Sequence, residues 1–69
     1  MIQAILFSKK EYSDKEAKNW LKNHNYNFIS NRITNNYRRY RLIEPNYRKY
    51  IYRIQHINNN ISFIMQYKK

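Results

Sequence analysis

The strongest constraint on the fold is one signal for a helix start, Ser13-x-x-Glu16, in a chain whose other segments read as strands. Ser13 and Glu16 form a capping box, and Asp14 in the first turn is stabilised by the helix dipole. Asn25 stands where a helix ends in a left-handed residue, because the chain has no glycine and asparagine is the next most tolerant residue. We therefore predict one helix, Asp14 to His24. Its buried stripe comprises Ala17, Trp20, Leu21 and His24.

The remaining segments are short and rich in residues that favour strands, and asparagine-rich turns separate them. We predict a single small basic domain, residues 1–69, of the α+β class. One helix packs on one face of a four- to five-stranded, mostly antiparallel sheet, in the chain order βαββββ. The expected strands are Ile2–Phe7, Phe28–Ile33, Tyr37–Ile43, Lys49–Ile57 and Ile61–Tyr67.

One helix can cover only one face of such a sheet, so the alternation within each strand decides which side chains stay uncovered. In the strand that starts at Tyr37, Tyr40 and Leu42 alternate with Tyr37, Arg39 and Arg41. We expect Tyr40 and Leu42 under the helix, together with Ile61, Phe63 and Met65. The strand from Lys49 is ambiguous, because both of its alternating sets are partly apolar. If Arg53 joins Arg39 and Arg41, the bare face is a surface of arginine and tyrosine.

The charge of the chain favours a polyanionic partner. The chain contains fourteen Lys and Arg residues and four acidic residues, which gives a net charge of +10. The composition is also typical of AT-rich coding, which by itself enriches lysine and tyrosine. Arginine clustering is more informative, because five of the six arginines lie between Arg38 and Arg53.

Several functional classes receive little support from these residues. There is no cysteine, so a disulfide scaffold and a thiolate metal site are both excluded. No apolar run approaches the ~20 residues that span a bilayer, and the first one lacks the features of a signal peptide. Two histidines and four acidic residues offer little for catalysis, and three of the acids lie in or beside the helix start. We expect no enzyme, no cofactor, no metal, no small-molecule substrate and no membrane partner.

DNA or RNA is the expected partner, because arginine binds phosphate through a planar fork and tyrosine stacks on bases. The alternative is a small virion or assembly component that docks on an acidic protein or capsid partner, since Tyr and Arg are also enriched at protein interfaces. A purely structural explanation of the same pattern is that tyrosine favours strands and that arginine keeps the outer face of a thin sheet hydrated. The residues expected to bind are Arg38, Arg39, Arg41, Arg48, Lys49 and Arg53, with Tyr37, Tyr47 or Tyr50 at the edge, and Lys15, Lys18 and Lys22 on the helix.

Four segments span nearly the whole chain: QAILFSK, EAKNWLKNHNY, NYRRYRLIEP and YRIQHINNNISFI. Their Trp-Leu-x-x-His helix and Tyr-x-Arg-aromatic-Arg strand resemble a short domain of tailed-phage and large DNA virus proteins, found alone or ahead of a prohead protease. The chain departs from that pattern at Asn25, Asn58 and Asn60, where glycine is usual, and at Leu42, where glutamine is usual. The resemblance implies the fold and a viral setting, but no activity. We accordingly expect the host cytoplasm, the nucleus or the virion interior rather than secretion.

Overall fold

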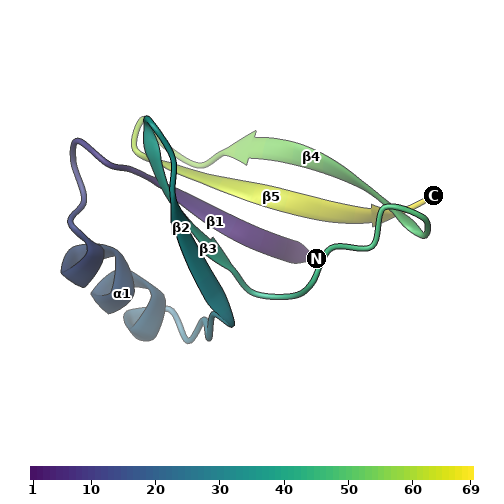
Figure 1. Ribbon diagram of the computed structural model, residues 1–69, viewed down its shortest axis with the longest axis horizontal. Coiled ribbons are helices and arrows are strands. Elements are labelled where there is room, and N and C mark those ends of the chain that lie inside the picture. Colours follow the sequence, from purple (N-terminus) through teal and green to yellow (C-terminus); the bar gives the residue numbers. More distant parts are fainter.

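A computed structural model describes residues 1–69 and contains one helix and one sheet of five antiparallel strands (Figure 1). This confirms the α+β class and the predicted order of elements along the chain. In space the strands follow the order β2-β3-β1-β5-β4, so the first strand lies at the centre of the sheet. The elements are β1 (Ile2–Ser8), α1 (Asp14–Asn23), β2 (Ser30–Ile33), β3 (Tyr37–Arg41), β4 (Tyr50–His56) and β5 (Ile61–Lys68).

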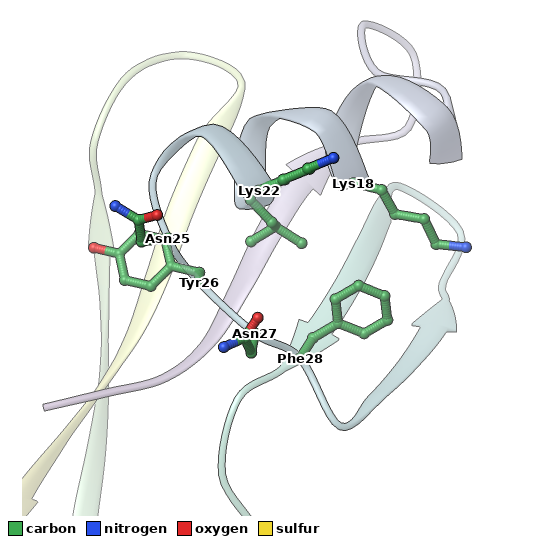
Figure 2. A pocket seen from close by; sticks show the side chains of 7 residues that line it. Lys18, Lys22, Asn25, Tyr26, Asn27 and Phe28 are labelled. Atoms are coloured by element: carbon green, nitrogen blue, oxygen red, sulfur yellow. The ribbon is translucent and has the colours of Figure 1, made fainter.

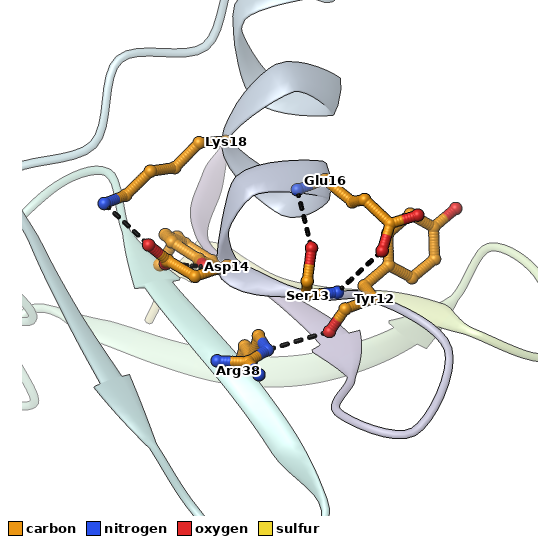
Figure 3. Close-up of polar contacts among 7 residues, drawn as sticks. Tyr12, Ser13, Asp14, Glu16, Lys18 and Arg38 are labelled. Carbon is orange, nitrogen blue, oxygen red and sulfur yellow. Dashed lines mark hydrogen bonds and ion pairs between the residues drawn. The ribbon is translucent and has the colours of Figure 1, made fainter.

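The helix begins and ends where its local signals indicate. The Ser13 hydroxyl accepts a hydrogen bond from the backbone N–H of Glu16, and the Glu16 carboxylate accepts one from the backbone N–H of Ser13, both at 3.1 Å (Figure 3). This is the predicted capping box. Asn25, with φ of 62°, is the only residue other than glycine in the left-handed region, as expected for a helix end in a chain without glycine.

The core lies between α1 and the sheet, centred on Phe7. The rings of Tyr12, Trp20 and Tyr40 surround the Phe7 ring at centroid distances of 5.1, 5.4 and 5.6 Å. Leu42 and Phe63, both expected under the helix, pack against this cluster while partly buried. The fully buried members of the cluster are Ile5, Phe7, Ala17, Leu21, Tyr40 and Ile61.

Trp20 is less buried than its place in the predicted stripe indicates. It is only partly buried, and it stacks on exposed His24 at 3.9 Å between ring centroids. Ala17 and Leu21 are the buried residues of the helix. At about 100° per residue around the helix axis, Trp20 is turned about 60° from Ala17 and about 100° from Leu21, which places it at the margin of the stripe. Of the four residues expected in the buried stripe, Ala17 and Leu21 are buried and Trp20 packs at its margin, whereas the expectation that His24 is buried is wrong.

The connection from β3 to β4 crosses one end of the sheet. In Figure 1 this segment runs past the N-terminus to reach β4 near the C-terminus. The backbone N–H of Leu42 donates to the Gln3 carbonyl at 2.8 Å, which ties the start of this segment to β1. The predicted strand Tyr37–Ile43 ends two residues early, because β3 ends at Arg41 and the chain bends at residues 42 and 43. No helix of the structure is long and apolar enough to cross a membrane.

Candidate nucleic-acid interface

The strand register decides which side chains lie on the sheet face away from α1, here called the open face. Residues directly opposite each other in an antiparallel pair share a face. Ile5 of the core lies opposite Tyr40, whereas Leu6 lies opposite Arg39. Arg39, and Arg41 two residues further along β3, therefore lie on the open face, as the alternation in the sequence predicts. The larger side chains assigned to this face by register are Leu6, Arg32, Tyr37, Arg39, Arg41, Tyr50, Tyr52, Ile54, His56, Ile64, Gln66 and Lys68.

Three arginines gather on the half of the open face formed by β2 and β3. Arg32 lies directly opposite Arg39, and Ser30 lies directly opposite Arg41. A hollow of about 200 Å³ opens among these side chains, and no hydrophobic residue lines it. Arg32 is absent from the expected set of binding residues, although the alternation of Ser30 and Arg32 with Asn31 and Ile33 would have indicated it. We call Arg32, Arg39 and Arg41 the arginine triad.

Little negative charge offsets the triad. The one acidic contact is between Arg41 Nη1 and Glu44 Oε2 at 3.6 Å, and the Glu44 side chain is 72% exposed. An exposed ion pair at that distance contributes little. Like charges directly opposite across two strands are destabilising, so Arg32 and Arg39 repel each other in the free protein. The triad is therefore a concentrated and largely uncompensated positive charge.

Arg39 and Arg41 are fixed against the sheet, so they do not extend freely into solvent. Both are half-buried, and their Nε atoms are inaccessible and have no hydrogen-bond partner within the chain. Arg39 Nη2 donates a long hydrogen bond of 3.4 Å to Gln3 Oε1, and the Gln3 side-chain amide in turn donates to the Ile43 carbonyl at 2.9 Å. Gln3 itself is 1% exposed. The expectation of outward-facing guanidinium groups is thus met only in part, because their stems cover the central strand.

Tyrosines occupy the other half of the open face, on β4 and the loop before it. The Tyr52 hydroxyl donates to Gln66 Oε1 at 2.8 Å and accepts from the backbone N–H of Asn46 at 2.7 Å. Tyr47, which is 66% exposed, packs its ring edge-on against Tyr52 at 5.1 Å. Tyr50 lies on the same face by register. Tyr52 was not among the expected residues, and its fixed position depends on Gln66, which is distant in sequence.

The register also places two expected residues on the face that packs against α1. Arg38 lies opposite Phe7, and its Nε donates to the Tyr12 carbonyl at 2.8 Å (Figure 3). It therefore braces the loop that leads into the helix. Arg53 lies opposite Met65, which shares its face with Phe63 of the core. Arg53 consequently does not join Arg39 and Arg41, and the ambiguity of this strand is resolved against that expectation.

The lysines of the helix lie on the opposite side of the sheet from the triad. Lys18 Nζ is 2.8 Å from Asp14 Oδ2, and the Tyr40 hydroxyl donates to the other Asp14 oxygen at 2.6 Å. The Lys18 contact and then the Tyr40 hydrogen bond hold the pKa of Asp14 below its ordinary value. Burial, followed by the nearby Asp14 carboxylate, raises the pKa of Tyr40. The charge of Lys18 is therefore partly neutralised by Asp14, while Lys15 is exposed.

A second hollow, of about 370 Å³, lies where the helix ends. Figure 2 shows Lys18 and Lys22 on the helix and the rings of Tyr26 and Phe28 on the segment that follows it. Lys18 Nζ lies 5.9 Å from the centre of the Phe28 ring. This hollow is separate from the open face, but another hollow, of about 290 Å³, is lined by both Lys18 and Arg32.

The other expected residues lie at the margins of the open face. Arg48 and Lys49 are exposed in the turn before β4, where their backbone N–H groups donate to Asn46 Oδ1 at 3.2 and 3.3 Å. Tyr37 lies at the start of β3 and is 37% exposed. The structure does not bring Arg48 and Lys49 together with the triad, whereas Tyr37 is the next residue before Arg39 on the same face of β3.

No group of three or more histidine or acidic side chains is placed to hold a metal ion. Comparison of the chain with protein-family models, with curated proteins and with solved structures gave no match.

Proposed function

We propose that the protein binds DNA or RNA without catalysis and with little sequence selectivity, through the open face. The observation that carries this proposal is the arginine triad, in which Arg32 and Arg39 are directly paired across β2 and β3 and neither forms an ion pair with an acidic residue. Repulsion between the two arginines destabilises the free protein, and a bound anion removes that repulsion and stabilises the fold. The viral or phage setting remains part of the proposal, and with it a place in the host cytoplasm, the nucleus or the virion interior.

The two halves of the open face suit the two parts of a nucleotide. The triad can bind phosphate oxygens through its planar N–H forks, while the exposed Tyr47 ring and Tyr50 of β4 can stack on bases. Stacking of this kind requires unpaired bases, so a single strand is the preferred ligand. No base-reading set of polar side chains lies in one row, which is why we propose weak selectivity.

The lysines of the helix are not part of this surface. Lys15, Lys18 and Lys22 lie on the helix, and the helix covers the face opposite the triad. We propose that Lys15 and Lys22 raise the general attraction to polyanions without contacting the same nucleotides as the triad. Their removal should slow or weaken binding slightly, whereas removal of the triad should abolish specific contacts with phosphate.

The decisive experiment compares two double variants that each remove two positive charges. Arg32→Gln/Arg39→Gln changes the open face, and Lys15→Gln/Lys22→Gln changes the helix side. Fluorescence anisotropy with labelled single-stranded DNA, single-stranded RNA and duplex DNA, at four salt concentrations, measures affinity and its salt dependence. Polyglutamate serves as a simple anionic control, and circular dichroism checks the fold.

We expect the wild-type affinity for a single strand to fall with salt, with a slope of ~0.7 for each phosphate contacted. The arginine double variant should lower that slope by about 1.4, and the lysine double variant should leave it nearly unchanged. Equal effects of the two variants would contradict a binding surface on the open face. Saturable binding to an acidic protein, without binding to any nucleic acid, would instead support the docking alternative.

A further inference from the structure

Four side chains at the edge of the open face form a small square. The pairs Ser30–Arg41 and Arg32–Arg39 are separated by one residue along β2 and β3, so all four side chains leave the sheet on the same side. Facing Cβ atoms in such pairs are about 5 Å apart, and next-but-one residues of a strand are about 7 Å apart. Three arginine side chains and the Ser30 side chain therefore stand close together on this face. All four line the hollow described above, together with Asn31 of β2.

The square has many more hydrogen-bond donors than the chain can satisfy. Each guanidinium carries five N–H donors and no acceptor. Within the chain the triad makes one hydrogen bond, of 3.4 Å to Gln3, and one ion-pair contact, of 3.6 Å to Glu44. Both are long for charge-assisted contacts, which are commonly about 2.7 to 2.9 Å. The half-buried stems of Arg39 and Arg41 hold these two groups in place before any ligand arrives.

We propose that this square is a subsite for a dianionic phosphate, and that it receives the terminal phosphate monoester of a nucleic-acid strand. This inference rests on the proposed function and names the part of the ligand that binds there. A phosphate monoester carries a charge of about −1.5 to −2 at pH 7 and three terminal oxygens, whereas a backbone phosphodiester carries one charge. Three arginine side chains that line one hollow match the larger charge.

The position of the square supports an end rather than an internal phosphate. β2 is an outermost strand, and all four of its residues are exposed. A chain end can enter from this side, while the rest of the strand crosses the open face toward Tyr52 and Tyr47 on the other half. If an internal phosphodiester occupied the hollow, the strand would have to leave the hollow on both sides of that phosphate.

The test uses single-stranded oligonucleotides of one sequence that differ only at their ends. One carries a 5′-phosphate, one a 3′-phosphate, and one has hydroxyl groups at both ends. A fourth, one nucleotide longer and without end phosphates, controls for added charge. Dissociation constants are measured for the wild type, for Arg32→Gln and for Arg48→Gln, which removes the same charge from an exposed turn.

We expect one of the two phosphorylated oligonucleotides to bind the wild type at least about tenfold more tightly than the hydroxyl-ended one. Arg32→Gln should remove that difference, whereas Arg48→Gln should keep it. In a nuclear magnetic resonance titration with inorganic phosphate, the side-chain Nε–H signals of the triad should shift before those of Arg38 and Arg53.

Three results would overturn the inference in distinguishable ways. Equal binding of all oligonucleotides would remove the terminal-phosphate subsite and leave the proposed function standing. Failure of every oligonucleotide to bind would remove both. A phosphoserine peptide that binds at least as tightly as the phosphorylated strand would show that the square receives phosphate from a protein.

Discussion

Replacing Arg32 by glutamine should make the free protein more stable, which is unusual for a change at a single surface residue. Arg32 lies directly opposite Arg39 on the open face, and the only acidic contact of the triad is to Arg41. Directly opposed like charges cost about 0.2 to 1 kcal/mol. Because Arg32 is exposed and thus partly screened, we expect a gain of about 0.5 kcal/mol in the free energy of unfolding at low salt. For a domain of this size, that corresponds to a rise of about 2 to 4 °C in Tm.

The assay is thermal and urea unfolding followed by the fluorescence of Trp20, which packs on the core and stacks on His24. Measurements at 10 mM and at 1 M salt separate charge repulsion from other effects, because the Debye length falls from about 30 to about 3 Å. The gain should be present at low salt and nearly absent at high salt. Arg48→Gln, which lowers the net charge equally but lies in an exposed turn, is the control.

The same variant connects stability to binding. In the presence of a saturating oligonucleotide, the wild type should become the more stable protein, because only it retains the full set of contacts with phosphate. A loss of stability at low salt, or a gain no larger than that of Arg48→Gln, would refute the opposition of Arg32 and Arg39 that the register shows.

Two further predictions concern the helix. Tyr40→Phe removes the 2.6 Å hydrogen bond to Asp14 and should cost about 1 kcal/mol, measured by urea unfolding at pH 7. Since Lys18 and Tyr40 lower the pKa of Asp14 from 3.8, the associated stability is present above pH 3.8 and is lost as the pH falls through the lower pKa of the folded state. Asp14→Asn should remove that part of the acid dependence, and an unchanged pH profile would contradict it. Asn25→Gly should preserve stability or raise it by up to about 1 kcal/mol, whereas Asn25→Ala should lower Tm, because φ of 62° costs residues with a Cβ more than glycine.

Local signals in the sequence determine the helix and the strand segments well. The capping box at Ser13 and the left-handed end at Asn25 each depend on residues within one helical turn, so both were predicted correctly. The alternation of Tyr40 with Arg39 and Arg41 also predicts the correct faces, because one set has a single large core residue and the other is charged.

Features that depend on distant pairing were not predictable in the same way. Arg53 lies on β4, an outermost strand, where both alternating sets are partly apolar and exposed, so the sequence does not distinguish the two faces. The burial of Gln3 and Gln66 depends on Arg39 and Tyr52, which reach them across neighbouring strands. Only the register, which no local pattern specifies, brings these residues together.

Arg32 shows a different limit. Its strand is four residues long and fully exposed, so no buried set fixes its register in the sequence. The pairing with β3 supplies that register and turns two separate arginine positions into an opposed pair. The arginine triad therefore depends on strand pairing. Composition alone indicates only that the charge of the surface is positive.

The most direct test of the account is to identify which side of the sheet nucleic acid contacts. In a titration of the labelled protein with a single-stranded oligonucleotide, nuclear magnetic resonance can follow arginine Nε–H and tyrosine ring signals, which report on one face each. We predict shifts for Arg32, Arg39, Arg41 and Tyr47, with Arg38 and the helix lysines unchanged. Shifts confined to Lys15, Lys18 and Lys22 would contradict the open face as the binding surface.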